Sequence, residues 1–177
     1  MSSLVGFISL VLAILFNLYL VISNFFIKNN SNVFNLIVRS SSFLTIISFF
    51  SLMFAYVISD FSNFNVFQNS HSEKPLIYKI SGTWGNHEGS LLLWLLVLTF
   101  FIFLFLLSSN NQPKKYRILT LLFQQIIIFG FFVFLLKTSN PFNYIFPVPK
   151  EGLGLNPILQ DPLLAIHPPI LYLGYVG

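Results

Sequence analysis

The stretch that decides the fold is LVGFISLVLAILFNLYLVISNFFI, residues 4–27, an apolar run broken only by glycine, serine and asparagine. As a helix it is roughly 36 Å long at about 1.5 Å per residue, enough to cross a bilayer core of about 30 Å. No Lys or Arg precedes it, and it is longer than the roughly 7 to 15 residues of a signal-peptide core. The run therefore predicts a retained membrane span.

Three further apolar runs follow, at 43–59, 90–107 and 118–136, and residues 168–177 read as the start of a fifth span. The 177-residue chain is 55% hydrophobic and only 8% charged, whereas soluble domains carry about 25% charged residues. These features predict an all-α fold: a polytopic helical membrane protein, residues 1–177, with four complete transmembrane helices plus the start of a fifth. Within the spans, Asn17, Gln124 and Gln125 are predicted to bond between helices.

The absence of cysteine excludes thiolate chemistry, and the scattered positions of the basic residues argue against nucleic-acid binding. The chain has no cysteine, so it cannot provide a thiolate ligand or attach haem to itself covalently. Its nine basic residues give a net charge of +4 but are spread over short loops, without the basic stripe that nucleic acid requires. We therefore expect no nucleic-acid partner.

Charge is distributed unevenly between the predicted connections. All five acidic residues fall in the connections 60–89 and 137–167, whereas the first and third connections are short and hold basic residues only. By the positive-inside rule, the N-terminus and the two long connections face the outer side of the membrane. The basic residues of the short connections are Lys28, Arg39, Lys114, Lys115 and Arg117.

The first unusual segment is SGTWGNHEGSLLLW, residues 81–94, at the outer end of the third span. Asn86 or Ser90 is suited to cap the helix, which places Glu88 near the positive end of the helix dipole. Spacing alone favours an interfacial belt of tryptophans on a capped helix, and it excludes a His-Glu-x-x-His zinc site because Leu91 stands where the second histidine would be.

The second unusual segment, residues 152–177, is rich in proline and contains His167 directly before Pro168 and Pro169. Because proline removes a backbone donor and biases its predecessor towards extended geometry, we expect an irregular outer segment up to Pro169, with His167 extended. A neutral imidazole held at the mouth of a helix can ligate haem iron. A hydrogen-bonded structural histidine at the interface is the alternative that spacing leaves open.

Taken together, WGNHEGS at residues 84–90 and LNPILQDPLLAIHPPILYLGYVG at residues 155–177 resemble the N-terminal region of the CcmF family, the haem lyases of cytochrome c maturation. The resemblance implies a protein that attaches haem to apocytochrome c. It implies that His167 is an axial ligand of the iron of haem b, held beside a tryptophan-rich outer surface. It also makes Trp84, His87 and Glu88 candidates for lining the haem site, and it assigns no catalytic residue.

The resemblance also implies partners, since the family pattern continues with further spans. We expect this chain to be a fragment or one product of a split gene, active as a haem lyase only within a complete complex. The implied partners are membrane lipid, the remaining C-terminal part, apocytochrome c, a haem chaperone and thiol-handling maturation proteins. The 23 phenylalanines, with many Asn and Ile, favour an AT-rich organellar genome and hence the mitochondrial inner membrane, with a bacterial plasma membrane as the alternative.

Two other functions compete with the haem lyase. A non-enzymatic structural or haem-transport subunit of a larger assembly accounts for the same segments. A solute transporter is less favoured, because the four complete spans contain no ionisable residue of the kind that coupled transport places near the membrane midplane.

Overall fold

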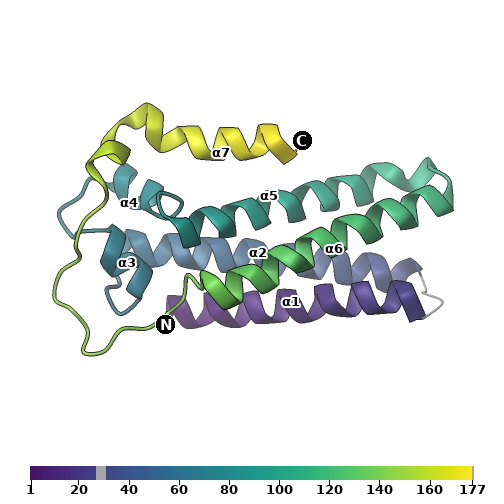
Figure 1. Ribbon diagram of the computed structural model, residues 1–177, viewed down its shortest axis with the longest axis horizontal. Helices are drawn as coiled ribbons and strands as arrows, with labels where there is room; N and C mark the ends of the chain where they lie inside the picture. The colour runs from purple at the N-terminus through teal and green to yellow at the C-terminus, as the bar shows by residue number, and fades with distance from the viewer. Residues whose placement is uncertain (27–30, 177) are drawn as a thin grey trace.

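The computed structural model describes residues 1–26 and 31–176, and the described residues form helices with no β-strand (Figure 1). An all-α membrane fold is therefore confirmed. Ile27, Lys28 and Gly177, which belong to predicted spans or connections, lie outside the described residues. The long helices are α1 (Ser2–Phe26), α2 (Ser31–Val57), α5 (His87–Ser108) and α6 (Lys114–Thr138). The shorter ones are α3 (Phe64–Asn69), α4 (Leu76–Gly82), η1 (Ser109–Asn111), η2 (Pro157–Gln160) and α7 (Pro162–Val176).

The four long helices run alternately up and down and form one bundle, and each is long and apolar enough to cross a membrane. Large apolar side chains cover their outer faces as well as their inner ones, which fits a lipid environment rather than water. Examples of exposed apolar residues are Leu15, Phe43, Phe54 and Phe123.

The helix that contains the second predicted span begins before that span does. Helix α2 begins at Ser31 rather than at Phe43, so Arg39 lies on the helix and not in a connection. Hydropathy marks only the part of a helix that is rich in apolar residues, whereas the backbone continues as a helix until a residue breaks it. Residues 31–42 contain no glycine or proline, so nothing stops the helix there.

The expectation of an irregular segment up to Pro169 is wrong. Helix α7 begins at Pro162 and runs through His167, Pro168 and Pro169, so the His167 backbone is helical rather than extended. Proline at the first helical position costs no hydrogen bond and has a suitable φ. The Asp161 carboxylate accepts hydrogen bonds from the backbone N–H groups of Leu163 (2.8 Å) and Leu164 (3.1 Å), which caps this early start.

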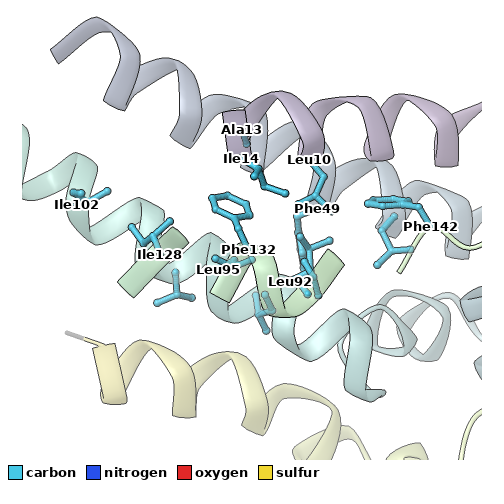
Figure 2. Packing of buried hydrophobic residues seen from close by; sticks show 14 of the residues in the cluster. Leu10, Ala13, Ile14, Phe49, Leu92, Leu95, Ile102, Ile128, Phe132 and Phe142 are labelled. Carbon is cyan, nitrogen blue, oxygen red and sulfur yellow. The ribbon is translucent and has the colours of Figure 1, made fainter. Parts of the chain in front are cut away.

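The core of the bundle is a continuous apolar cluster to which all four long helices contribute (Figure 2). The Asn17 amide of α1 donates a hydrogen bond to the Gln125 side chain of α6, which confirms the predicted bonding between helices for these two residues; the side-chain oxygen of Gln124 has no partner among the described residues. Asn17 and Gln125 are almost completely buried. The cluster includes Leu10, Ala13, Ile14, Phe49, Leu92, Leu95, Ile102, Ile128, Phe132 and Phe142.

Residues 58–86 and 139–161 together form a cap at the end of the bundle that also holds the N-terminus (Figure 1). The two segments are joined by backbone hydrogen bonds from Phe64 N to Asn143 O (2.9 Å) and from Leu153 N to Phe67 O (2.8 Å). Phe142 anchors the cap in the bundle, and a Cβ added at Gly6 would lie 2.3 Å from its ring. The cap therefore holds the ends of α2, α5 and α6 in one rigid arrangement.

Candidate functional site

The first turn of α5 is built around Asn86 and Gly89, in the segment singled out from the sequence. The Asn86 side chain accepts a hydrogen bond from Gly89 N (2.8 Å), so the predicted cap at Asn86 is confirmed. The chain folds back so tightly that a Cβ at Gly89 would lie only 1.6 Å from the Thr83 carbonyl oxygen. Glycine at this position is thus a steric requirement of the turn between α4 and α5.

A network of buried and half-buried polar side chains connects this turn to the cap and to α2. The Asn65 amide of α3 donates to the Asn86 side chain (3.0 Å) and to the Glu88 carboxylate (3.1 Å). The Asn86 amide in turn donates to the Tyr56 hydroxyl (3.0 Å), and that hydroxyl donates to Asn65, whose side-chain oxygen lies at 2.5 Å and whose backbone oxygen lies at 3.1 Å. Glu88 is therefore bound from within the protein, at the positive end of the α5 dipole.

Trp84 lies between the bundle and α7. Its ring is stacked on Phe49 of α2, with 6.5 Å between ring centroids and 13° between the planes. Its indole N–H donates a 2.8 Å hydrogen bond to the backbone carbonyl of Ala165, in the first turn of α7. Trp84 thus connects the bundle to the helix that carries His167.

His167 lies on the opposite side of α7 from the residues that pack on the bundle. Ala165 is buried, and Tyr172 stacks on Trp94 of α5 with centroids 5.2 Å apart. His167 follows Ala165 by two residues, or about 200° around the helix. Its side chain is accordingly exposed, and none of the described residues forms a hydrogen bond or ion pair with it.

The structure connects Trp84 with the helix that carries His167, and it gives Glu88 and His87 different surroundings. Trp84 and His167 belong together, because Trp84 binds the α7 backbone two residues before the histidine. Glu88 faces Asn65, and His87 is exposed at the start of α5. The sequence reading did not identify Asn65 or Tyr56 as part of this network; the only signal was a polar, asparagine-rich segment directly after the second span.

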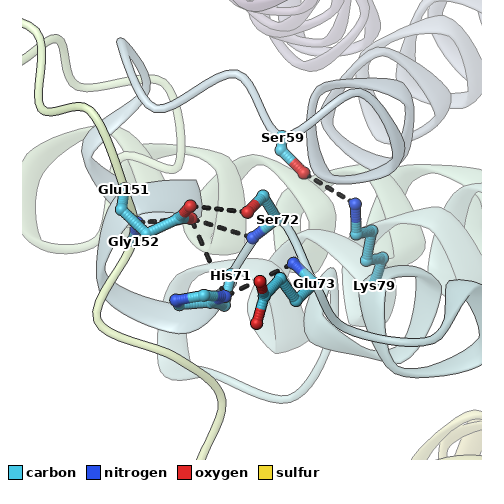
Figure 3. Close-up of polar contacts among 7 residues, drawn as sticks. All are labelled: Ser59, His71, Ser72, Glu73, Lys79, Glu151 and Gly152. Atoms are coloured by element: carbon cyan, nitrogen blue, oxygen red, sulfur yellow. Dashed lines mark hydrogen bonds and ion pairs between the residues drawn. The ribbon is translucent and has the colours of Figure 1, made fainter.

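A second polar cluster, also in the cap, is centred on Glu151 (Figure 3). The Glu151 carboxylate accepts hydrogen bonds from the side chain and the backbone N–H of Ser72 (2.8 Å for the latter) and lies 3.9 Å from His71. The bonds from the Ser72 hydroxyl and backbone lower the pKa of Glu151 to about 2. This cluster joins the two segments of the cap.

Comparison with known proteins gives a consistent result. Residues 84–177 match the model of the family described as cytochrome C assembly protein. The cytochrome c-type biogenesis protein CycK of Rhizobium meliloti is 58% identical over 134 residues, which are 76% of this chain and 20% of that protein. The protein CcmF of Escherichia coli is 44% identical over 131 residues, 73% of this chain and 20% of that protein.

A solved structure described as cytochrome c heme lyase CcmF shares the fold. It superposes with a TM-score of 0.80 at 25% identity, and the match covers 100% of this chain and 28% of that one. The chain spans about a fifth of the length of the curated relatives it matches.

Proposed function

The chain belongs to the cytochrome c assembly protein family, and we propose that it works within a haem lyase that attaches haem covalently to apocytochrome c. In this proposal His167 holds the haem on the outer face as an axial ligand of the iron. The observation that carries the proposal is an exposed imidazole, without a partner among the described residues, near the start of a helix in the part of the chain that matches the family.

The residues present fit haem as a bound substrate. The described residues contain no group of three or more His, Cys, Asp or Glu side chains that could hold a bare metal ion. Haem needs only an axial ligand from the protein, since the porphyrin supplies the others, and a histidine imidazole is a common one. Of the proposed lining residues, His87 is free to face a ligand, whereas Glu88 is engaged with Asn65.

The share of this chain in the reaction is to bind and orient. The thioether bonds form between the vinyl groups of haem and the cysteines of apocytochrome c, so the reactive groups belong to the substrates. Holding haem at His167, in the helix next to the cap, turns the encounter with apocytochrome c into a reaction between oriented partners. The chain has no thiol; the remaining C-terminal part, a haem chaperone and thiol-handling proteins complete the proposed assembly.

The cap is proposed to face the outer side of the membrane. Lys114, Lys115 and Arg117 lie close together at the start of α6, at the other end of the bundle, whereas the basic residues of the cap are spread over its two long segments; a higher density of basic residues on the inner side is the asymmetry that the positive-inside rule describes. The relatives named above are bacterial, which fits a bacterial plasma membrane and gives no support to the mitochondrial inner membrane.

The ligand role is tested by His167→Ala in the complex purified with its partners and loaded with haem. We expect the haem content to fall and the visible absorption bands to shift, because the iron loses an axial ligand. His71→Ala is the matched control, since it removes another imidazole from the same end of the molecule. Unchanged haem content and bands in His167→Ala would contradict the ligand role.

Reconstitution with apocytochrome c and haem tests the reaction itself. A haem lyase yields covalently bound haem in the cytochrome, which denaturing electrophoresis followed by haem staining detects. A complex that binds haem but yields no covalent product would instead support the structural or haem-transport role.

A further inference from the structure

We propose that Trp84 is a positioning residue for His167, and this inference rests on the proposed function. Its indole N–H takes the place of the backbone donor that Pro169 lacks, and so it fixes the first turns of α7 against the bundle. Trp84, so far only a candidate for lining the haem site, would then act by holding α7 in place.

The hydrogen-bond pattern of α7 explains why Ala165 needs a partner. In an α-helix, the carbonyl of residue 165 accepts from the N–H of residue 169. That residue is Pro169, which has no N–H, and it lies inside the helix. The Ala165 carbonyl is therefore released from the helix, and the Trp84 indole N–H donates to it at 2.8 Å.

The indole is held in place from both sides, so this bond is a rigid one. Trp84 is stacked on Phe49 of α2. On the side of α7, the cavity that Trp84, Leu159 and Pro168 line has a volume of only about 10 Å³, room for one water molecule at most. Ala165 itself is only 3% exposed.

The rest of α7 is anchored less firmly. Beyond the first turns, the stacking of Tyr172 on Trp94 is the only ring contact that the described residues provide. Ile170, Leu173 and Tyr175 are well exposed. Because His167 follows Ala165 by two residues on the same rigid turn, a shift or rotation of Ala165 moves the imidazole directly.

The test uses Trp84→Phe in the haem-loaded complex, since phenylalanine keeps an aromatic ring beside Phe49 but has no N–H. We expect haem retention to weaken about two- to tenfold, the change that loss of one hydrogen bond produces. The absorption bands should shift in the direction seen for His167→Ala, and added imidazole should restore them. Imidazole replaces a displaced ligand but does not refold a protein, so this rescue distinguishes positioning from general destabilisation.

Two further variants make the test specific. Trp94→Phe is the matched control, because Trp94 makes ring contacts and donates no hydrogen bond to the described residues; it should keep wild-type haem retention. Pro169→Ala restores an N–H to the Ala165 carbonyl, so Trp84→Phe should cause a smaller loss in that background than in the wild type.

Several results would overturn the inference. Wild-type bands and retention in Trp84→Phe, while His167→Ala loses haem, would remove the positioning role and leave the ligand role intact. Equal losses from Trp84→Phe in the wild-type and Pro169→Ala backgrounds would show that the bond to Ala165 does not matter. If Trp84→Phe accumulates poorly in the membrane and adding Pro169→Ala does not improve its accumulation, the bond to Ala165 likewise does not matter. No change in His167→Ala would refute the ligand role and the positioning role together.

Discussion

Gly89→Ala tests the tight turn that supports the candidate site. The added Cβ would lie 1.6 Å from the Thr83 carbonyl oxygen, whereas a carbon and a carbonyl oxygen approach to about 3.3 Å at the closest. The turn must therefore open by about 1.7 Å, and the atom in the way is backbone rather than a flexible side chain. Overpacking of this kind costs about 1–3 kcal/mol, and loss of the Asn86 cap adds about 1 kcal/mol.

We expect Gly89→Ala to lower the free energy of unfolding by about 3 kcal/mol, measured by helical circular dichroism as a denaturant is added to the detergent-solubilised protein. Gly130→Ala is the matched control, because nothing lies within 4 Å of a Cβ at that position. It should be neutral or stabilising by up to about 1 kcal/mol. Equal stability of the two variants would refute the steric argument.

Two other predictions concern polar groups away from the site. Asn17→Leu leaves Gln125 without its partner in the bundle core and should cost about 1–2 kcal/mol, whereas Asn17→Leu combined with Gln125→Leu should recover most of that loss in the same unfolding assay. Glu151, with its folded-state pKa lowered to about 2 from 4.5, stabilises the cap above pH 4.5, and this contribution disappears as the pH falls towards 2. As the pH is lowered through this range, the melting temperature should fall more steeply for the wild type than for Glu151→Gln. An equal fall in the two proteins would refute the role of the Ser72 bonds.

The parts of the fold that depend on local sequence could be predicted. Long apolar runs marked all four spans, because a membrane span needs little beyond length and hydropathy. The cap at Asn86 followed from the preference of that residue type for the position before a helix. That Asn17 and Gln125 bond between helices followed because buried amides in apolar spans require partners, although their pairing with each other was not predicted.

The parts that depend on distant contacts could not be predicted. Two consecutive prolines argue against a helix locally, yet α7 includes both, because a donor from Trp84, 81 residues earlier, binds the released Ala165 carbonyl. The bond between Asn65 and Glu88 likewise joins two connections whose pairing no local pattern indicates. Both features depend on a hydrogen bond between residues far apart in the sequence.

The most direct test of the central claim is a structure of the haem-loaded complex, determined by electron cryomicroscopy with this chain in its assembly. We expect haem on the exposed face of α7 at the cap end, with a ring nitrogen of His167 bonded to the iron. Haem held elsewhere in the complex, with both axial positions filled by other groups and the His167 ring facing lipid, would contradict the proposed function.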